Sequence, residues 1–227
     1  MLRPEVLAKD PANRLRASQS PRRLDAEFVR DNALSISGLL NLDLGGPSIK
    51  PYQPPGYYAN LQFPDRDYLA NSDDRQYRRG VYMHWQRTFL HPMLANFDAP
   101  SRDECAVFRT QANSPQQALT LLNDPTFVEA ARTWAAQLIT TGGDDAAKLL
   151  RAFSTALGRA PSTEESGPLL KFLAKQRATY AMQADAASAL LRTGLAPLPP
   201  EDQRAEVAAW TQVCRVILNL HETITRL

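Results

Sequence analysis

Cysteine and histidine are scarce in this sequence, and their scarcity limits the chemistry that the chain can support. The 227 residues include two cysteines, Cys105 and Cys214, and three histidines. Two thiols cannot make a disulfide framework, although these two could pair in an oxidising compartment. No zinc-ligand spacing and no C-x-x-C-H haem attachment motif occurs. We therefore expect no metal and no cofactor in this chain, and structural roles for its histidines.

An excess of one charge sign is also lacking. The 26 Lys and Arg residues nearly balance the 24 Asp and Glu residues, which leaves a net charge of +2. This balance favours no nucleic-acid partner. No apolar run approaches the roughly 18 residues that a membrane helix needs. The first residues are charged from position 3 and lack the apolar core of a signal peptide. We expect neither a membrane span nor a signal peptide in this chain.

The sequence does contain enough apolar residues for a core, together with a long segment that is rich in proline and glycine. Hydrophobic residues make up 44% of the chain, which argues against wholesale disorder. Between Gly45 and Gly56 there are four prolines and three glycines. Proline lacks the backbone donor that a helix or a central strand needs. Residues 43–75 are therefore predicted to form a long ordered loop, and a strap that covers the core is favoured over a binding loop.

Helical spacing is predicted on both sides of this loop, over residues 22–41 and 76–90. One face of the first range comprises Phe28, Val29, Ala33, Ile36 and Leu40, and one face of the second comprises Tyr77, Val81, Trp85 and Thr88. Pro92 is expected to end the second helix, because proline disfavours helical backbone in the residue before it.

From Ser114 onward the sequence predicts helices throughout. Ser114 and Ser162 each begin a capping box, and Asp124 precedes a proline that suits the first position of a helix. The residues expected to face inward are Phe127, Ala131, Trp134, Ala135, Leu138, Leu150, Phe153, Leu157, Leu169, Leu173, Gln176, Tyr180, Val207, Trp210, Cys214, Ile217, His221 and Ile224. The predicted fold is all-α, an irregular helical bundle with a long ordered Pro/Gly-rich loop. Residues 1–113 should pack on the bundle of residues 114–227 to give one continuous domain.

Eight segments, taken in order, resemble those of a known family. They are DPANRLRAS, RRLDAEFVRDNAL, GGPSIKPYQPPG, YRRGVYMHWQRT, FDAPSRDEC, RTQANSPQQALTLLNDPTFVEAAR, ALGRAPSTEE and AAWTQVCRVILNLHETITR. Together they cover nearly the whole chain. On these segments the chain resembles the planctomycete C-terminal domain of unknown function 1553.

The resemblance implies a setting more than an activity. In that family the domain usually ends a long secreted or envelope-associated protein, behind a second domain of unknown function and often behind a cytochrome c-like domain. It implies a periplasmic or envelope location, with any haem held by those other domains. It further implies that Met1 is an internal start or the start of a split gene product. The implied partners are the domains that precede this one, or a separate partner chain.

Three groups of polar residues are candidates for a ligand site. Glu27 and Asp31 lie four residues apart and could act as acid and base, although neighbouring arginines favour an ion-pair network. Asp98 lies in a loop, residues 96–105, that Arg79 or Arg87 could hold or turn into an anion site. The third group, in the Pro/Gly-rich loop, suits carbohydrate or peptide, or the packing of the loop itself. The candidate residues are Glu27, Arg30, Asp31, Lys50, Tyr52, Gln53, Arg79, Arg87, Asp98 and Arg109.

Catalytic and nucleotide-binding motifs are missing, since the sequence has no Walker A, G-x-G-x-x-G or G-x-S-x-G pattern. The favoured interpretation is a non-catalytic binding or scaffold module, with polysaccharide as a further ligand. It predicts an apolar surface that the chain itself leaves uncovered. One alternative is a hydrolase or lyase that acts on acidic or sulfated polysaccharide. The other is an accessory to a cytochrome c electron-transfer domain.

Overall fold

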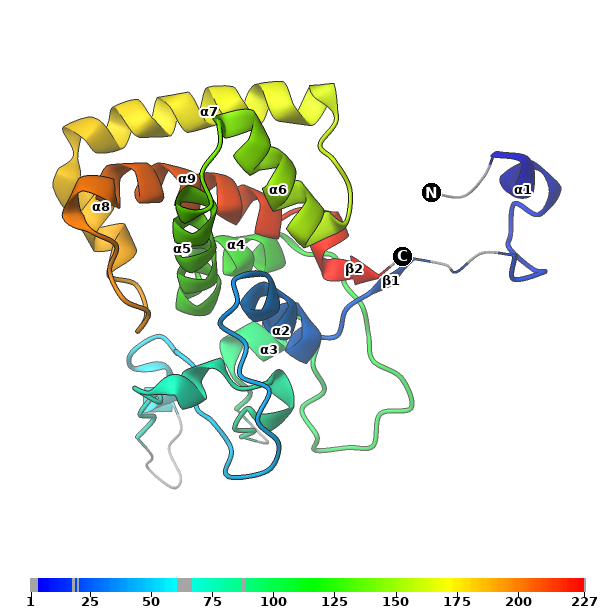
Figure 1. Ribbon diagram of the computed structural model, residues 1–227. Helices are drawn as coiled ribbons and strands as arrows, with labels where there is room; N and C mark the ends of the chain where they lie inside the picture. Colours follow the sequence, from blue (N-terminus) through cyan, green and yellow to red (C-terminus); the bar gives the residue numbers. More distant parts are fainter. Residues whose placement is uncertain (1–3, 18, 20, 61–66, 87–88, 227) are drawn as a thin grey trace.

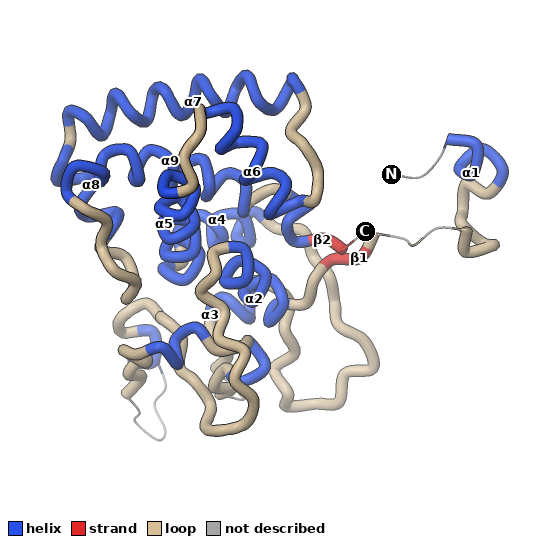
Figure 2. Tube along the Cα trace, in the orientation of Figure 1, coloured by secondary structure: helices blue, strands red, loops and turns tan. Residues whose placement is uncertain are grey.

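Helices make up most of the chain (Figures 1 and 2). The computed structural model describes residues 4–17, 19, 21–60, 67–86 and 89–226. Its helices are α1 (Pro4–Lys9), α2 (Ala26–Ile36), α3 (Pro92–Asn96), α4 (Pro115–Asn123), α5 (Pro125–Thr140), α6 (Asp145–Leu157), α7 (Thr163–Met182), α8 (Ala184–Leu191) and α9 (Arg204–Leu218). The mostly α fold that the sequence predicts is therefore confirmed.

Short 3₁₀ turns and one small β-ribbon complete the described structure. The turns are Tyr57–Asn60, Asp74–Tyr77, Gly80–Tyr82, Glu201–Gln203 and His221–Ile224. The strands β1 (Arg22–Arg23) and β2 (Thr225–Arg226) pair antiparallel and so bring together segments near the two ends of the sequence. Helix α1 lies apart from that body in Figure 1. None of the helices in the described ranges is long and apolar enough to cross a membrane.

Side chains cap the helices of the second half where the sequence predicts. The Ser114 backbone N–H donates to Gln117 Oε1 at 3.1 Å. The Asp124 carboxylate accepts from the Thr126 N–H at 2.9 Å. Ser162 and Glu165 bond reciprocally, at 2.7 and 3.2 Å. Each cap satisfies a backbone donor that the helix leaves without a partner, so the chain begins its helices at these residues.

The core lies where α5 and α9 pack against each other. The seam of α9 is buried as predicted at Val207, Trp210, Cys214 and Ile217. Helices α7 and α8 cover other faces of α9, and α2 packs on α5. The predicted stripe of α5, from Phe127 to Leu138, is also fully buried. The first half of the chain is thus attached to the bundle through α2.

Several predicted boundaries and faces are wrong. The helix predicted over residues 22–41 extends only from Ala26 to Ile36, because residues 22–23 pair with β2. Phe28 and Leu150, expected inside, are 51% and 47% exposed. Helix α9 ends at Leu218, and His221 is exposed in the turn that follows.

The α-helix predicted over residues 76–90 is also wrong. The described part of this range contains two 3₁₀ turns and extended backbone, and Val81 is 66% exposed. Gly80 packs directly on α2, since a Cβ on it would lie 2.7 Å from the Glu27 carbonyl oxygen. Long-range contacts with α2 and with the loop that follows α2 therefore replace local helix formation in the described part of residues 76–90. Pro92, expected to end a helix, instead begins α3, where its missing N–H costs no hydrogen bond.

The Pro/Gly-rich segment is ordered, and part of it lies against the core. We refer to residues 43–60 as the strap. Ile49 of the strap is fully buried, and its N–H donates to the Tyr82 carbonyl at 2.8 Å. Tyr58 is 8% exposed and its ring contacts that of Tyr68, with centroids 5.1 Å apart. These contacts agree with a strap that uses its own side chains as anchors.

Candidate interaction surface

The acid–base pair considered on α2 is held by other groups. Arg109 donates to both Glu27 carboxylate oxygens, at 2.6 and 3.0 Å. Burial raises the pKa of Glu27, but the hydrogen bonds and charge of Arg109 outweigh it and leave that pKa lowered. Asp31 accepts from the Gly80 N–H at 2.6 Å, and burial raises its pKa. The two carboxylates therefore fix two different loops to α2.

Arg30 is fully buried and supports the backbone of the 3₁₀ turns. Its Nη1 donates to the Arg78 carbonyl at 2.7 Å, and its Nη2 donates to the Gln76 carbonyl. Its nearest carboxylate is that of Asp31, at 3.9 Å. Burial lowers the pKa of this guanidinium. A buried arginine thus supplies the donors that a helix would otherwise supply to these carbonyls.

Among the described residues, the loop around Asp98 is held by backbone and aromatic groups. The Asp98 carboxylate accepts from the Ala112 N–H at 2.7 Å. At the far side of the loop, the Arg102 guanidinium lies 3.8 Å from the centre of the Trp85 ring. The charge of Arg79 acts on Asp31 and partly offsets the rise in its pKa that burial causes. Arg87 lies outside the described residues.

The strap candidates face inward or pack on the segment that follows the strap. The Lys50 carbonyl accepts from the Asn71 N–H, and the Lys50 N–H donates to Asn71 Oδ1. The Lys50 Nζ lies 5.6 Å from the centre of the Tyr68 ring. The Gln53 side chain is partly buried. The Tyr52 hydroxyl donates to Glu129 at 2.9 Å. The strap candidates therefore do not converge on one open ligand site.

Glu129 is a buried centre that the sequence analysis missed. It is 1% exposed, and it accepts hydrogen bonds from the hydroxyls of Tyr52 and Tyr77 at 2.9 and 2.8 Å. It also accepts from the N–H groups of Leu195 and Ala196, at 2.5 and 2.7 Å. One carboxylate therefore joins α5, the strap, a 3₁₀ turn and the α8–α9 linker.

Arg132 and Gly194 complete this centre. Arg132 lies one turn along α5, with its Nη2 3.7 Å from Glu129, and donates to the carbonyls of Thr193, Ala196 and Pro197. Gly194 has φ +84, and a Cβ there would lie 2.0 Å from the Glu129 Cδ. The sequence does contain a signal for this centre. Glu129 and Arg132 are opposite charges three residues apart on a helix that is apolar on most other sides.

His91 is a second buried polar group with a structural role. Its Nδ1 accepts from the Met93 N–H at 3.3 Å and so caps α3, while its Nε2 lies 2.8 Å from the Tyr52 carbonyl oxygen. The ring is therefore neutral, with Nε2 as donor and Nδ1 as acceptor. Burial lowers the pKa of His91 to about 4.

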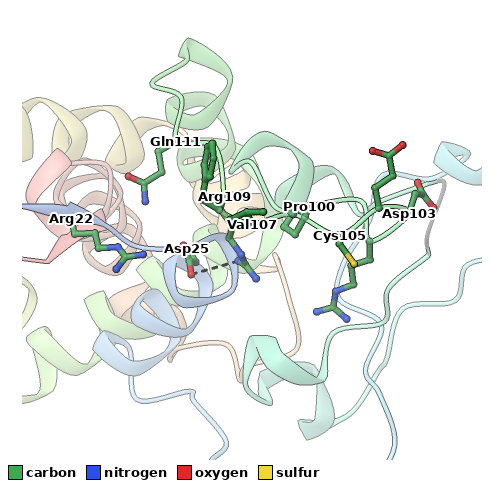
Figure 3. A pocket seen from close by; sticks show the side chains of 12 residues that line it. Arg22, Asp25, Pro100, Asp103, Cys105, Val107, Arg109 and Gln111 are labelled. Carbon is green, nitrogen blue, oxygen red and sulfur yellow. Dashed lines mark ion pairs between the residues drawn. The ribbon is translucent and has the colours of Figure 1, made fainter.

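An open hollow of about 680 Å³ lies beside the long loop between α3 and α4 (Figure 3). We call it the loop hollow. Val107 and Phe108 on this loop are 97% and 81% exposed. The loop hollow is lined by Arg22, Asp25, Pro100, Arg102, Asp103, Glu104, Cys105, Ala106, Val107, Phe108, Arg109 and Gln111.

The loop that carries these apolar residues is held on both sides of them. Before them, Arg102 stacks on Trp85. After them, Arg109 pairs with Glu27, and the Ala112 carbonyl accepts from Arg23. Two large apolar side chains are therefore presented to solvent from a loop with fixed ends. Exposed apolar side chains that the described chain does not cover make this loop the candidate for a contact surface.

Comparison with protein families identifies the chain. A family model described as PSD1, protein of unknown function (DUF1553), matches residues 1–173. This chain belongs to the PSD1 family. The family resemblance drawn from the sequence is thereby confirmed, and the family itself carries no assigned function. No match was found among the curated proteins or among the solved structures.

The match ends inside α7, whereas the core continues beyond it. Helix α9 lies after residue 173, yet its buried seam packs on α5, which lies within the match. The loop hollow lies wholly in the matched region, from Arg22 to Gln111. In this PSD1 chain, α8 and α9 therefore complete a core on which the matched region depends.

Among the described residues there is neither a candidate metal site nor a disulfide. Over the ranges that the structure describes, no group of three or more His, Cys, Asp or Glu side chains could hold a metal ion. Both cysteines are free thiols, with Cys214 buried in α9 and Cys105 exposed on the loop. The pairing that an oxidising compartment would allow is not present.

Proposed function

We propose that this PSD1 chain is a non-catalytic docking module and that the loop hollow is its contact surface for a protein partner. The observation that supports this most directly is the exposure of Val107 and Phe108 on a loop with both ends fixed. An ordered loop loses little conformational freedom on binding, so the apolar area that it buries contributes to affinity.

The polar candidates support the same proposal. Glu27 is bonded to Arg109, Asp31 caps the backbone at Gly80, and Asp98 holds Ala112. A glycosidase needs two carboxylates that face one substrate bond across a cleft. These carboxylates instead act as supports for loops, which favours docking over hydrolysis of an acidic polysaccharide.

The partner that we propose is one of the domains that precede this one in proteins of the family. In the experiment, those domains are produced separately and titrated with this chain by calorimetry. We expect binding, and we expect the double variant Val107→Asp/Phe108→Asp to lose at least about tenfold in affinity, because charges would replace buried apolar contacts.

The matched control is Leu42→Asp/Leu44→Asp, which changes two exposed leucines of and beside the strap, 68% and 80% exposed. This variant should bind like the parent chain. The proposal fails if the parent chain does not bind the preceding domains. It also fails if both double variants lose affinity equally, because the contact would then not depend on the loop.

A further inference from the structure

Two arginines face each other across the β-ribbon without an acidic partner. Arg22 of β1 and Arg226 of β2 are directly opposite in the antiparallel register. Side chains at opposite positions of such a pair lie on the same face, and like charges there repel each other. Within the described residues, neither guanidinium has a carboxylate within ion-pair distance. The ribbon therefore keeps a like-charged pair that has no ion-pair partner among the described residues.

The neighbouring arginine shows what a structural arginine looks like in the same strand. Arg23 points to the other face of β1, as alternation along a strand requires. Its guanidinium donates to the Ala112 carbonyl and to Gln117 Oε1, at 2.5 Å for the latter, and it lies 5.6 Å from the centre of the Phe97 ring. Unlike Arg23, Arg22 and Arg226 have guanidinium N–H groups without a hydrogen-bond partner in the described chain.

A second hollow lies at this pair and adjoins the first. It has a volume of about 190 Å³ and is lined by Arg22, Arg23, Leu24, Asp25, Phe28 and Arg226. Three arginines there face one carboxylate, and Asp25 lies 3.7 Å from Arg109 instead. Phe28 is 51% exposed at the same place. Cationic and apolar groups thus meet at one small hollow.

The two hollows form one continuous surface, because both are lined by Arg22 and Asp25. In Figure 3 these two side chains lie at one end of the loop hollow, and Asp103 and Cys105 lie at the other. A ligand that lies along this surface would meet two guanidiniums first and the apolar side chains of Val107 and Phe108 next. An extended segment with carboxylates followed by apolar residues has that order of groups.

We propose that Arg22 and Arg226 bind the carboxylates of an acidic peptide segment whose apolar residues contact Phe28, Val107 and Phe108. This inference rests on the proposed docking function and names the chemistry of the partner. Arginine suits the role because its planar fork donates two parallel hydrogen bonds to a carboxylate. The bound carboxylates would also remove the repulsion across the ribbon.

The lining favours a peptide over an acidic polysaccharide. A sugar chain needs many hydrogen-bonding groups for its hydroxyls, yet Gln111 is the single side-chain amide among the lining residues of the two hollows. No Ser, Thr or Tyr hydroxyl occurs among those lining residues. Apart from its charged residues and Gln111, the lining consists of Leu24, Phe28, Pro100, Cys105, Ala106, Val107 and Phe108, and these match apolar residues of a peptide.

The test measures fluorescence anisotropy of a short labelled peptide in which a run of Glu residues is followed by a run of Leu residues. Two comparison peptides carry Lys in place of Glu, or Ser in place of Leu, and a chondroitin sulfate oligosaccharide competes as the alternative ligand. We expect the Glu/Leu peptide to bind best. Arg22→Ala and Arg226→Ala should each weaken that binding about tenfold, whereas Arg192→Ala, which changes an exposed arginine just after α8, should not change it.

A stability measurement separates ligand binding from a structural role. Arg226→Glu would place opposite charges across the ribbon, so we expect a higher melting temperature together with lost peptide binding. A structural role for the pair would lower the melting temperature in this variant and is not expected. Phe28→Ser should weaken binding, whereas Leu150→Ser, which changes a leucine of α6 that is 47% exposed, should not.

The outcomes that overturn the inference are distinct from those that overturn the docking function. Equal binding of the Glu and Lys peptides, or unchanged affinity in both arginine variants, sinks the carboxylate site. Tighter binding of the oligosaccharide than of the peptide assigns the surface to a glycan and overturns the inference as well. If the loop variants abolish binding of the preceding domains while Arg22→Ala does not, docking stands and the acidic partner is rejected.

Discussion

The capped helices and the irregular segments of this molecule satisfy their buried backbone by different means. In the half from α4 to α9, helices bond their own backbone and side chains cap their ends, as at Asp144 and Ser162. In the half from α2 to α3, the backbone runs through the strap and the 3₁₀ turns, and buried side chains provide its partners. Arg30 serves the carbonyls of residues 76 and 78, and Asp31 serves the N–H of Gly80.

This difference shows where single side chains matter most. A capped helix shares its stability among many local hydrogen bonds and packing contacts, so one lost contact has a limited cost. A loop held by one buried charged group depends on that group, because removing it leaves unpaired polar atoms in the interior. The following predictions test this contrast, beginning with the largest expected effect.

Glu129→Ala should cause the largest loss. The substitution removes four hydrogen bonds that join α5 to the strap, a 3₁₀ turn and the α8–α9 linker. It also leaves the buried Arg132 without its nearest carboxylate. We expect the free energy of unfolding to fall by about 3–5 kcal/mol. Urea denaturation measures this as a lower midpoint, with the slope showing whether unfolding stays two-state.

Glu129→Gln is the matched control, since it keeps the size of the side chain and an oxygen acceptor but removes the charge. Its loss should be clearly smaller than that of Glu129→Ala. A loss below about 1 kcal/mol in Glu129→Ala would show that the strap and the linker do not depend on this centre, because such values are typical of ordinary exposed contacts.

His91 should make stability depend on pH. Its pKa in the folded chain is lowered to about 4 from an ordinary value of 6.5, because burial disfavours the charged ring. The unfolded chain therefore binds a proton at higher pH than the folded chain does. The stability is full above pH 6.5 and falls progressively toward pH 4, by about 3 kcal/mol in total for this group.

The experiment compares the parent chain with His91→Asn across this pH range. Asn can keep the cap of α3, because its side-chain oxygen can accept from the Met93 N–H. Carboxylates titrate in both proteins, so the difference between their two stability profiles reports His91. If the two profiles run parallel from pH 7 to pH 4, the buried neutral ring contributes nothing to acid sensitivity.

The same contrast explains how much of the structure the sequence could predict. Capping residues such as Ser114, Asp124 and Ser162 act on donors two or three positions away, so a short window contains the whole interaction. The buried stripes of α5 and α9 likewise follow from local periodicity. The partners of Glu129 lie 52, 66, 67 and 77 residues away along the chain, so no local pattern joins them.

The predicted helix over residues 76–90 fails for the same reason. Its apolar spacing fits a helix, but the close packing of Gly80 on α2 and the bridges Asn41–Arg78 and Ile49–Met83 hold the chain in another conformation. The candidate surface could not be predicted from local sequence patterns either. That Val107 and Phe108 are exposed depends on how their loop packs on distant segments, and that Arg22 faces Arg226 depends on the register of two strands from opposite ends of the sequence.

The smallest expected effect is the loss of one helix cap in the second half. Asp144→Ala removes the acceptor for the Ala147 N–H, a bond of 2.8 Å at the exposed start of α6. We expect a loss of about 1 kcal/mol in the free energy of unfolding, because water can hydrate the freed donor. Asp144→Ser, which keeps an oxygen acceptor at this position, should recover most of it. The same urea measurement would place this value beside that of Glu129→Ala. Equal losses in the two alanine variants would mean that local caps and buried long-range centres carry equal weight, and the contrast between capped helices and segments held by buried side chains would then be wrong.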